Sequence, residues 1–501
     1  MSPRADGLWA RGVPRRLILP ACFLSGAVAA TGLAPLGLWP LALLGLAAVL
    51  WLVGQGENSR ATARRAWVAG AGYFALALAW IVEPFLVDIA KHGWMAPFAL
   101  LLMSFGLALF WAVAGTLAGW LGTGWRSRIA LFLPALALME LSRGYVFTGF
   151  PWALIGHHWI DTPVVQLAAF TGAHGLSALS LLVVALPLLW GARGLAGGVA
   201  VVAAVWVFGT LQPAPPAAPD APTLRLVQPN AAQHLKWRPD MVPVFWRRMM
   251  AQTAAPGAPD VVIWPETSVP YFLENADQAL AAMAQAADGT PIIAGIRRWQ
   301  ENRIYNSLIA IDPLGRVSHQ YDKHHLVPFG EYMPFAATFA RLGIFGLAAE
   351  DTSGYTPGPG AAVLNLGGAL GTMLPLICYE AIFPQDLRAA PTRPDWVLQI
   401  TNDAWFGRFS GPYQHLDQAR LRAVEMGLPV VRVANTGVSA VIDARGQVTH
   451  ALALNTAGFL DAPLPAALPE TPYARIGDAP AGGAFLLLLG LIIAFRRRLP
   501  H

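Results

Sequence analysis

Charged residues are scarce in this chain. Asp, Glu, Lys and Arg together make up 13% of its 501 residues, whereas hydrophobic residues make up 55% and the mean hydropathy is +0.48. This composition lies outside the range of ordinary soluble domains. The sequence therefore predicts a membrane protein.

Cysteine is nearly absent as well. The two cysteines are Cys22, which lies within an apolar run, and Cys378, which lies in the more polar half of the chain. Burial of one of them in lipid argues against a disulfide between the two. Cys378 is then an unpaired thiol. Such a thiol is either a reactive group or a small buried hydrophobic residue, and the residue alone leaves both interpretations open.

The apolar residues are unevenly distributed. Residues 17–211 form successive long apolar runs, whereas residues 222–470 have the charged turns of a soluble domain. Since about 20 apolar residues cross a bilayer as a helix, we expect eight spans, near residues 17–33, 36–53, 66–83, 94–121, 129–148, 164–190, 194–211 and 481–495. The predicted domains are a transmembrane bundle of seven helices (1–211), a proline-rich linker (212–222), a catalytic domain (223–470), and a last span with a basic tail (471–501).

Positive charges mark alternate loops. One set of flanks contains Arg4, Arg11, Arg15, Arg16, Arg60, Arg64, Arg65, Arg126, Arg128, Arg193, Arg496, Arg497 and Arg498. The opposite set holds little beyond Lys91 and Arg143. Because cytoplasmic loops retain Lys and Arg, we expect both termini to be cytoplasmic and the domain between the last two spans to be extracytoplasmic. The net charge of +5 follows mostly from this asymmetry and does not indicate nucleic-acid binding.

Residues 223–470 alternate short apolar strands with amphipathic helices. The predicted strands are 224–227, 261–264, 292–296, 307–311, 373–377, 397–400 and 430–433, and the predicted helices are 241–254, 275–287, 384–390 and 412–427. Near-continuous apolar strands are typical of sheets covered on both faces. Two similar segments, 308–317 and 440–448, turn on Asp-x-x-Gly and predict antiparallel hairpins. We therefore expect an α/β layered sandwich with two sheets between helical layers.

Two of these strands end at chemically useful side chains. One apolar strand leads into Cys378, and another leads through Trp264 and Pro265 into Glu266. Strand ends are where sites assemble in α/β layers. A thiolate is a nucleophile, and apolar surroundings raise the pKa of a carboxyl group toward that of a general base. A solvated acid at a strand end is the commoner role for an arbitrary glutamate, so Glu266 is a candidate base that needs further support.

The loop that contains Lys323 is dense in charged, aromatic and turn residues, which is typical of a functional loop. Lys323 can stabilise an oxyanion and favour a thiolate, and either Glu331 or Glu380 can orient it. His324 and His325 suggest a metal site, but adjacent residues of an extended segment point apart and no third ligand is spaced nearby. The sequence therefore predicts a site without metal or cofactor.

Three large aromatic residues near these motifs have two possible roles. Trp405 and Phe406 follow a predicted strand, and Trp237 lies between two basic residues. Such side chains form either a wall for an acyl chain and a lip that dips into the membrane, or part of a core or interface. The sequence leaves both interpretations open.

Together these motifs resemble the nitrilase, or carbon-nitrogen hydrolase, superfamily. The resemblance rests on residues 264–267, 323–332, 378–380 and 402–407. It implies a catalytic triad of Glu266, Lys323 and Cys378, with Glu331 as a second essential acid and Tyr379 and Glu380 as supporting residues. Eight spans with such a domain before the last one resemble the apolipoprotein N-acyltransferase family, in which Trp237 matches a functionally important tryptophan.

The resemblance implies an acyltransferase in the bacterial cytoplasmic membrane, with its catalytic domain on the periplasmic face. A phospholipid, typically phosphatidylethanolamine, would donate its sn-1 acyl chain through a thioester on Cys378 to the N-terminal amine of a diacylglyceryl cysteine in an apolipoprotein. Because water would hydrolyse a thioester, we expect the aromatic residues Phe329, Tyr332, Trp405 and Phe406 to shield it. Two alternatives are a membrane-anchored amidase, which the same triad would serve, and a transporter or lipid-binding protein whose external domain has lost catalysis.

Overall fold

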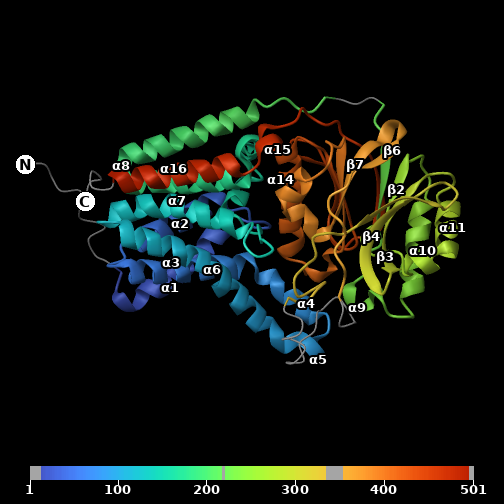
Figure 1. The fold of residues 1–501 in the computed structure, drawn as a ribbon, viewed down its shortest axis with the longest axis horizontal. Coiled ribbons are helices and arrows are strands. Elements are labelled where there is room, and N and C mark those ends of the chain that lie inside the picture. Colours follow the sequence, from blue (N-terminus) through green and yellow to red (C-terminus); the bar gives the residue numbers. More distant parts are fainter. Residues whose placement is uncertain (1–12, 217–219, 335–353, 496–501) are drawn as a thin grey trace, which may run out of the picture.

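The computed structural model describes residues 13–216, 220–334 and 354–495. It has two parts, a bundle of long helices and an α/β domain that lies at one end of the bundle (Figure 1). The predicted positive charges at Arg4, Arg11 and 496–498 lie outside the described residues, as does the stretch 217–219 of the predicted linker.

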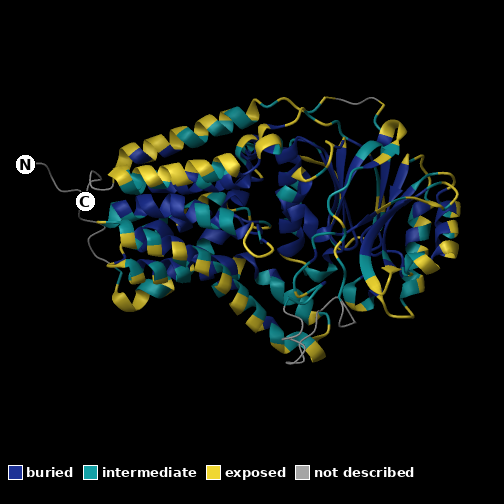
Figure 2. Cartoon of the chain, in the orientation of Figure 1, coloured by how far each residue is buried: buried dark blue, intermediate teal, exposed yellow. Residues whose placement is uncertain are grey.

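The bundle consists of apolar helices that lie side by side (Figure 1). They are α1 (Ile18–Ala30), α2 (Trp39–Gly54), α3 (Ser59–Ala77), α6 (Ala96–Leu121), α7 (Trp125–Arg143), α8 (Ala168–Thr210) and α16 (Ala479–Phe495). Their outward faces expose large apolar side chains such as Leu44, Leu102 and Trp120 (Figure 2). Helices that are apolar on their outward faces are suited to lipid surroundings.

Small residues let α1 and α3 approach each other closely. A Cβ atom at Gly72 would collide with the backbone of Phe23, and one at Gly26 would collide with the backbone of Ala69. Without a hydrophobic driving force between helices in lipid, close backbone approach of this kind supplies the packing energy.

Helix α8 is a hairpin of two antiparallel segments. Gly191 has non-helical torsion angles (φ 60°, ψ −134°) inside the helix. Beyond this turn, Gly198 lies beside Val183 and Gly209 lies beside Pro163, so the second segment runs back along the first. The turn falls between the predicted spans 164–190 and 194–211.

The structure does not confirm eight membrane spans. By length and composition, two helical stretches within the described residues are long and apolar enough to cross a membrane, Ile89–Leu121 and Pro163–Thr210, and the second of these includes the turn at Gly191. Ser59–Ala77 and Ala79–Leu86 add a third if this pair, bent by 66°, is one span, while Trp39–Gly54 and Ala479–Phe495 are shorter apolar helices. The predicted span 66–83 is one place where the prediction and the structure differ. The apolar run in the sequence is uninterrupted there, but helix α3 ends at Ala77 and the chain bends after it.

The α/β domain contains two sheets, as predicted, and each has six strands. In the first sheet the order is β12 (Gly458–Pro463), β1 (Thr223–Gln228), β2 (Val261–Ile263), β3 (Ile292–Gln300), β4 (Arg303–Ile311) and β5 (Val317–Asp322). In the second sheet the order is β11 (Val448–Leu452), β10 (Ser439–Ile442), β9 (Val430–Ala434), β8 (Trp396–Thr401), β7 (Gly371–Ile377) and β6 (Leu364–Gly367). Both predicted hairpins are confirmed, since β4 pairs antiparallel with β5, and β10 with β11.

Helices cover the outer face of each sheet. α10 (Val242–Thr253) and α11 (Asp277–Ala286) cover the first sheet on the side far from the bundle, and α14 (Gly411–Met426) covers the second sheet on the side of the bundle (Figure 1). The inner faces of the two sheets share a core that includes Leu226, Ile263, Ile377, Ile400 and Val433. The predicted layered sandwich is therefore confirmed.

Helix α14 joins the α/β domain to the bundle. The Gln414 side chain accepts a hydrogen bond from Trp152 Nε1 (2.7 Å) and donates one to the carbonyl of Ala34 (3.1 Å). Farther along the helix, Glu425 Oε1 accepts from the backbone N–H of Ala173 at the start of α8 (3.0 Å). These bonds are buried or partly buried and fix the orientation of the domain on the bundle.

The close contact between α1 and α3 predicts a specific loss of stability. Gly72→Leu should lower the Tm of the detergent-solubilised protein, because overpacking of this kind costs about 1–3 kcal/mol. Gly106→Leu on α6 is the matched control, since a Cβ atom there meets nothing within 4 Å. Equal Tm values for the two variants in a thermal unfolding experiment would contradict the proposed packing.

Candidate active site

The ends of several strands bring the three predicted catalytic side chains into one buried region. Glu266 follows β2, Lys323 follows β5 and Cys378 follows β7. Their side chains are almost inaccessible to solvent, with relative exposures of 6%, 1% and 6%. Strands of both sheets therefore contribute to the region, which lies between them.

Cys378 occupies a strained turn. It directly follows β7, begins a short 3-10 helix (η8, Cys378–Ile382) and has a φ of 53°. A positive φ is uncommon for a residue with a side chain and needs support from its surroundings. That support comes from Gln399, whose amide donates a hydrogen bond to the Cys378 carbonyl (3.0 Å).

Glu266 is fixed by two hydrogen bonds. Its Oε1 accepts from Asn306 Nδ2 (2.7 Å), and its Oε2 accepts from the backbone N–H of Asn402 (2.8 Å). Lys323 Nζ lies 3.8 Å from Oε1. Burial raises the pKa of Glu266 despite the opposing effect of the Lys323 charge. A carboxyl group with a raised pKa is suited to accept and return a proton near neutral pH.

Glu331 forms a buried ion pair with Lys323. The Lys323 ammonium lies 2.9 Å from Oε1 and 2.8 Å from Oε2 of this carboxylate. Glu331 is itself held by Asn306 Nδ2 (3.1 Å) and by the backbone N–H of Val327 (2.8 Å). Burial would lower the pKa of Lys323, but the charges of Glu331 and Glu266 raise it above its usual value and so favour the ammonium form.

Glu380 has a different position from Glu331. Its Oε1 accepts from the backbone N–H groups of His324 (2.8 Å) and His325 (3.2 Å), and its Oε2 accepts from the backbone N–H of Ile377 (2.7 Å). It therefore ties the loop after Lys323 to the turn that carries Cys378. Of the two glutamates that the sequence left open, Glu331 is thus the one that contacts the Lys323 ammonium.

A buried network beneath Cys378 was not predicted from the sequence. Asp403 interacts with Arg432 and with His415 Nδ1 (3.0 Å), and the Gln399 amide lies 2.9 Å from His415 Nε2. Burial would raise the pKa of Asp403, but Arg432 and His415 lower it to about 2. The ion pair of Asp403 and Arg432 thereby holds the imidazole of His415 and, through Gln399, the backbone of Cys378. The one available signal was that Gln399 and Arg432 interrupt the otherwise apolar strands β8 and β9.

The predicted shielding residues lie in different surroundings. Phe406 packs against Trp80 and Trp152, with ring centroids 4.9 and 5.8 Å apart, at the junction with the bundle. Trp405 and Tyr332 are partly buried, whereas Phe329 is half exposed.

Tyr379 and the two histidines of the loop pack together near the nucleophile. Tyr379 is buried against Phe383 (centroids 4.9 Å apart), and His325 stacks on the same ring. His324 contacts Glu380, and burial of the imidazole is outweighed by Asp386 and Glu380, which raise the pKa of His324 to about 10. Within the described ranges, no group of three potential ligands has the arrangement of a metal site.

Two family models match the chain. The carbon-nitrogen hydrolase model matches residues 215–473, and the model of the apolipoprotein N-acyltransferase N-terminal domain matches residues 25–186. The apolipoprotein N-acyltransferase of Bradyrhizobium diazoefficiens is 37% identical over 95% of this chain and 94% of its own length, and that of Caulobacter vibrioides is 37% identical over 97% and 96%. The chain belongs to the apolipoprotein N-acyltransferase family. A CN-hydrolase superfamily protein from Xanthomonas campestris of known structure covers 55% of the chain and 97% of its own, at 20% identity and a TM-score of 0.36.

As a member of the apolipoprotein N-acyltransferase family, the chain is an acyltransferase and a bacterial membrane enzyme. An acyltransferase that uses a thiol must first deprotonate it. Burial raises the pKa of Cys378, the charge of Glu266 raises it further, and Lys323 offsets only part of this effect. The expected effect of Lys323 on the pKa of the thiol is thus present but smaller than the opposing effects, which favour the protonated thiol in the resting protein.

The raised pKa of Cys378 predicts slow alkylation of the resting protein. At neutral pH, iodoacetamide should label Cys378 more slowly than it labels the same residue in the denatured chain, because burial depletes the thiolate. The labelling rate of the folded protein should still rise above pH 9, where that of the denatured chain levels off. Peptide mass spectrometry distinguishes Cys378 from Cys22. A plateau below pH 8 in the folded protein would contradict the prediction.

The contact between Glu331 and Lys323 predicts a large kinetic effect. Glu331→Gln should lower the rate of thioester formation by about 10²-fold, which is the size of effect seen when an oxyanion-stabilising group is lost or misplaced. Asp240→Asn is a control, because Asp240 forms an exposed ion pair with Arg238. Single-turnover measurement of the acylated protein provides the rate, and equal rates for both variants would exclude the assigned role.

Proposed function

We propose that the chain transfers the sn-1 acyl chain of a phospholipid, phosphatidylethanolamine in the simplest case, to the N-terminal amine of a diacylglyceryl cysteine in apolipoproteins. The observation that carries this proposal is a buried thiol, Cys378, grouped with the carboxyl of Glu266 and the ammonium of Lys323. The names of the curated relatives support the choice of acceptor.

In the first half-reaction, Glu266 accepts the thiol proton and the Cys378 sulfur attacks the carbonyl carbon of the ester. Lys323 and the backbone N–H of Tyr379 stabilise the tetrahedral oxyanion. As the intermediate collapses, the C–O bond breaks and Glu266 returns the proton to the departing lysophospholipid. The acyl chain remains on Cys378 as a thioester.

In the second half-reaction, the amine of the lipoprotein attacks the thioester carbon. Glu266 accepts a proton from the amine, and Lys323 again faces the oxyanion. Collapse breaks the C–S bond, the Cys378 sulfur takes the proton from Glu266, and the amide product leaves. Both half-reactions therefore use the same three side chains and consume no cofactor.

The proposed membrane arrangement follows from the substrates. Both are lipids, so a site attached to the end of an apolar bundle avoids the cost of extracting their chains into water. We propose eight crossings with both termini in the cytoplasm, so that the α/β domain faces the periplasm. The partly buried residues Trp405 and Tyr332, together with Phe329 and Phe406, would limit the access of water to the thioester.

The decisive test is the intact mass of the purified protein after incubation with phosphatidylethanolamine. We expect an increase by one acyl group on the wild type, which hydroxylamine or a diacylated lipopeptide removes. Cys378→Ser and Glu266→Gln should show no thioester. Release of free fatty acid in place of acylated peptide would show an amidase-like hydrolase, and the absence of both adduct and lysophospholipid would refute the transferase.

A further inference from the structure

Among the described residues, Arg297 of the first sheet has no charged partner. Arg297 on β3 pairs with Asn306 on β4, and residues that face each other in an antiparallel pair project from the same side of the sheet. The Asn306 amide contacts both Glu266 and Glu331. The side chain of Arg297 therefore leaves the sheet on the side where the catalytic carboxylates lie.

Two aromatic rings hold the Arg297 guanidinium without using its donors. Its Cζ lies 4.6 Å from the ring centroid of Trp237 and 4.8 Å from that of Phe272. Contacts with ring faces leave the N–H groups in the guanidinium plane available. Within the described part of the chain this side chain forms no hydrogen bond or ion pair, and its Nε is buried without a partner. Such a planar set of donors suits an anion with two oxygens.

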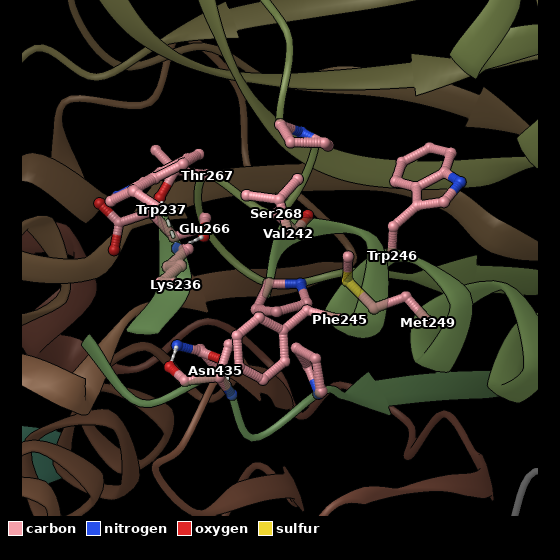
Figure 3. Close-up of a pocket in the computed structure, with 14 residues that line it drawn as sticks. Lys236, Trp237, Val242, Phe245, Trp246, Met249, Glu266, Thr267, Ser268 and Asn435 are labelled. Atoms are coloured by element: carbon pink, nitrogen blue, oxygen red, sulfur yellow. Dashed lines mark hydrogen bonds between the residues drawn. The ribbon is translucent and has the colours of Figure 1, made fainter. Parts of the chain in front are cut away.

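A second cation lies against the same tryptophan. Lys236, the last residue of α9 (Gln233–Lys236), is buried, and its Nζ lies 5.3 Å from the Trp237 ring centroid. It donates only to uncharged groups, the Glu266 carbonyl (3.2 Å) and the Thr267 hydroxyl (2.9 Å). Figure 3 shows Lys236 and Trp237 beside Glu266 and Thr267, at the end of the pocket opposite the apolar side chains of α10.

Arg297 and Lys236 give a local excess of positive charge next to Glu266. Burial and the charge of Arg297 lower the pKa of Lys236 to about 8, although Glu266 opposes the shift. A buried cation is stabilised most by an anion that hydrogen-bonds to it. The site therefore favours a ligand that brings a negative charge close to Glu266 and Cys378.

We propose that Arg297, held by Trp237 beside Lys236, binds the phosphodiester of the phospholipid donor, an inference that rests on the function proposed above. The donor carries this anion one glycerol unit away from the ester that Cys378 attacks. The acceptor instead presents an amine, which the two cations repel when it is protonated. Once the phosphodiester has left with the lysophospholipid, the same cations favour the neutral, nucleophilic form of the amine.

Arg297 is therefore a donor-binding residue that acts on the first half-reaction. The test compares Arg297→Gln with the wild type by following the thioester on Cys378 at increasing donor concentrations. Two donors with identical acyl chains are used, phosphatidylethanolamine and the corresponding diacylglycerol, which lacks the phosphate. Arg303→Gln is the matched control, because Arg303 lies on the same hairpin and is exposed.

We expect Arg297→Gln to raise the half-saturating concentration of phosphatidylethanolamine by about 10-fold or more, since a charge-assisted hydrogen bond is lost. Any reaction with diacylglycerol should be unchanged, and Arg303→Gln should match the wild type throughout. In addition, thioester formed at saturating donor should react with a diacylated lipopeptide at the same rate in the variant and the wild type.

Three results would overturn the proposal. The first is an unchanged dependence on phosphatidylethanolamine, and the second is an equal loss with both donors or in the lipopeptide step, which would mean that Arg297 only supports Trp237. The third is that inorganic phosphate raises the Tm of the wild type but not that of Arg297→Gln, while the two proteins depend equally on phosphatidylethanolamine. The site would then hold free phosphate and not the donor. Absence of a thioester on the wild type with either donor would refute the proposed function itself and this proposal with it.

Discussion

Two carboxylates and one ammonium share a space from which water is largely excluded, and the chemistry of the site follows from that constraint. Lys323 could not remain charged there without a partner, and Glu331 supplies that partner at hydrogen-bonding distance. Glu266 lies farther from the ammonium, at 3.8 Å, and is free to change its protonation state. In the proposed first half-reaction, Glu266 takes the proton of Cys378, so a negative charge moves from oxygen to sulfur while the total charge of the cluster stays the same. Proton transfer within such a cluster avoids the cost of creating a new buried charge.

A second cluster of buried charges lies beneath Cys378, and these charges are also paired. Arg432 and Asp403 are completely buried and neutralise each other, and their pairing fixes His415 and Gln399. The carbonyl of Cys378 accepts from the Gln399 amide, so the strained turn is supported by a network whose members each have a partner. In the proposed mechanism the cluster around Lys323 takes part in the reaction, whereas the cluster of Asp403 and Arg432 supports the backbone of Cys378 through Gln399.

Strand ends could be predicted because apolar runs that finish in polar residues are visible in the sequence, as at Glu266 and Cys378. The choice between Glu331 and Glu380 could not, because both acids lie near Lys323 or Cys378 along the chain and only the path of the loop separates them. Long-range pairs such as Asp403 with Arg432 leave no local pattern. The bundle was predicted in outline, since hydropathy identifies apolar segments but does not show where a helix ends or turns back, as it does at Gly191.

Helix α14 has a consequence for how the substrates must move. Two adjacent residues divide its contacts, since Gln414 binds the bundle and His415 belongs to the network that supports the nucleophile. No loop separates these two contacts. One turn of helix α14 therefore fixes the distance between Cys378 and the bundle. If the proposed function holds, a lipid substrate must therefore bring its ester to this fixed level above the bundle, and the length of its acyl chain does not change that level.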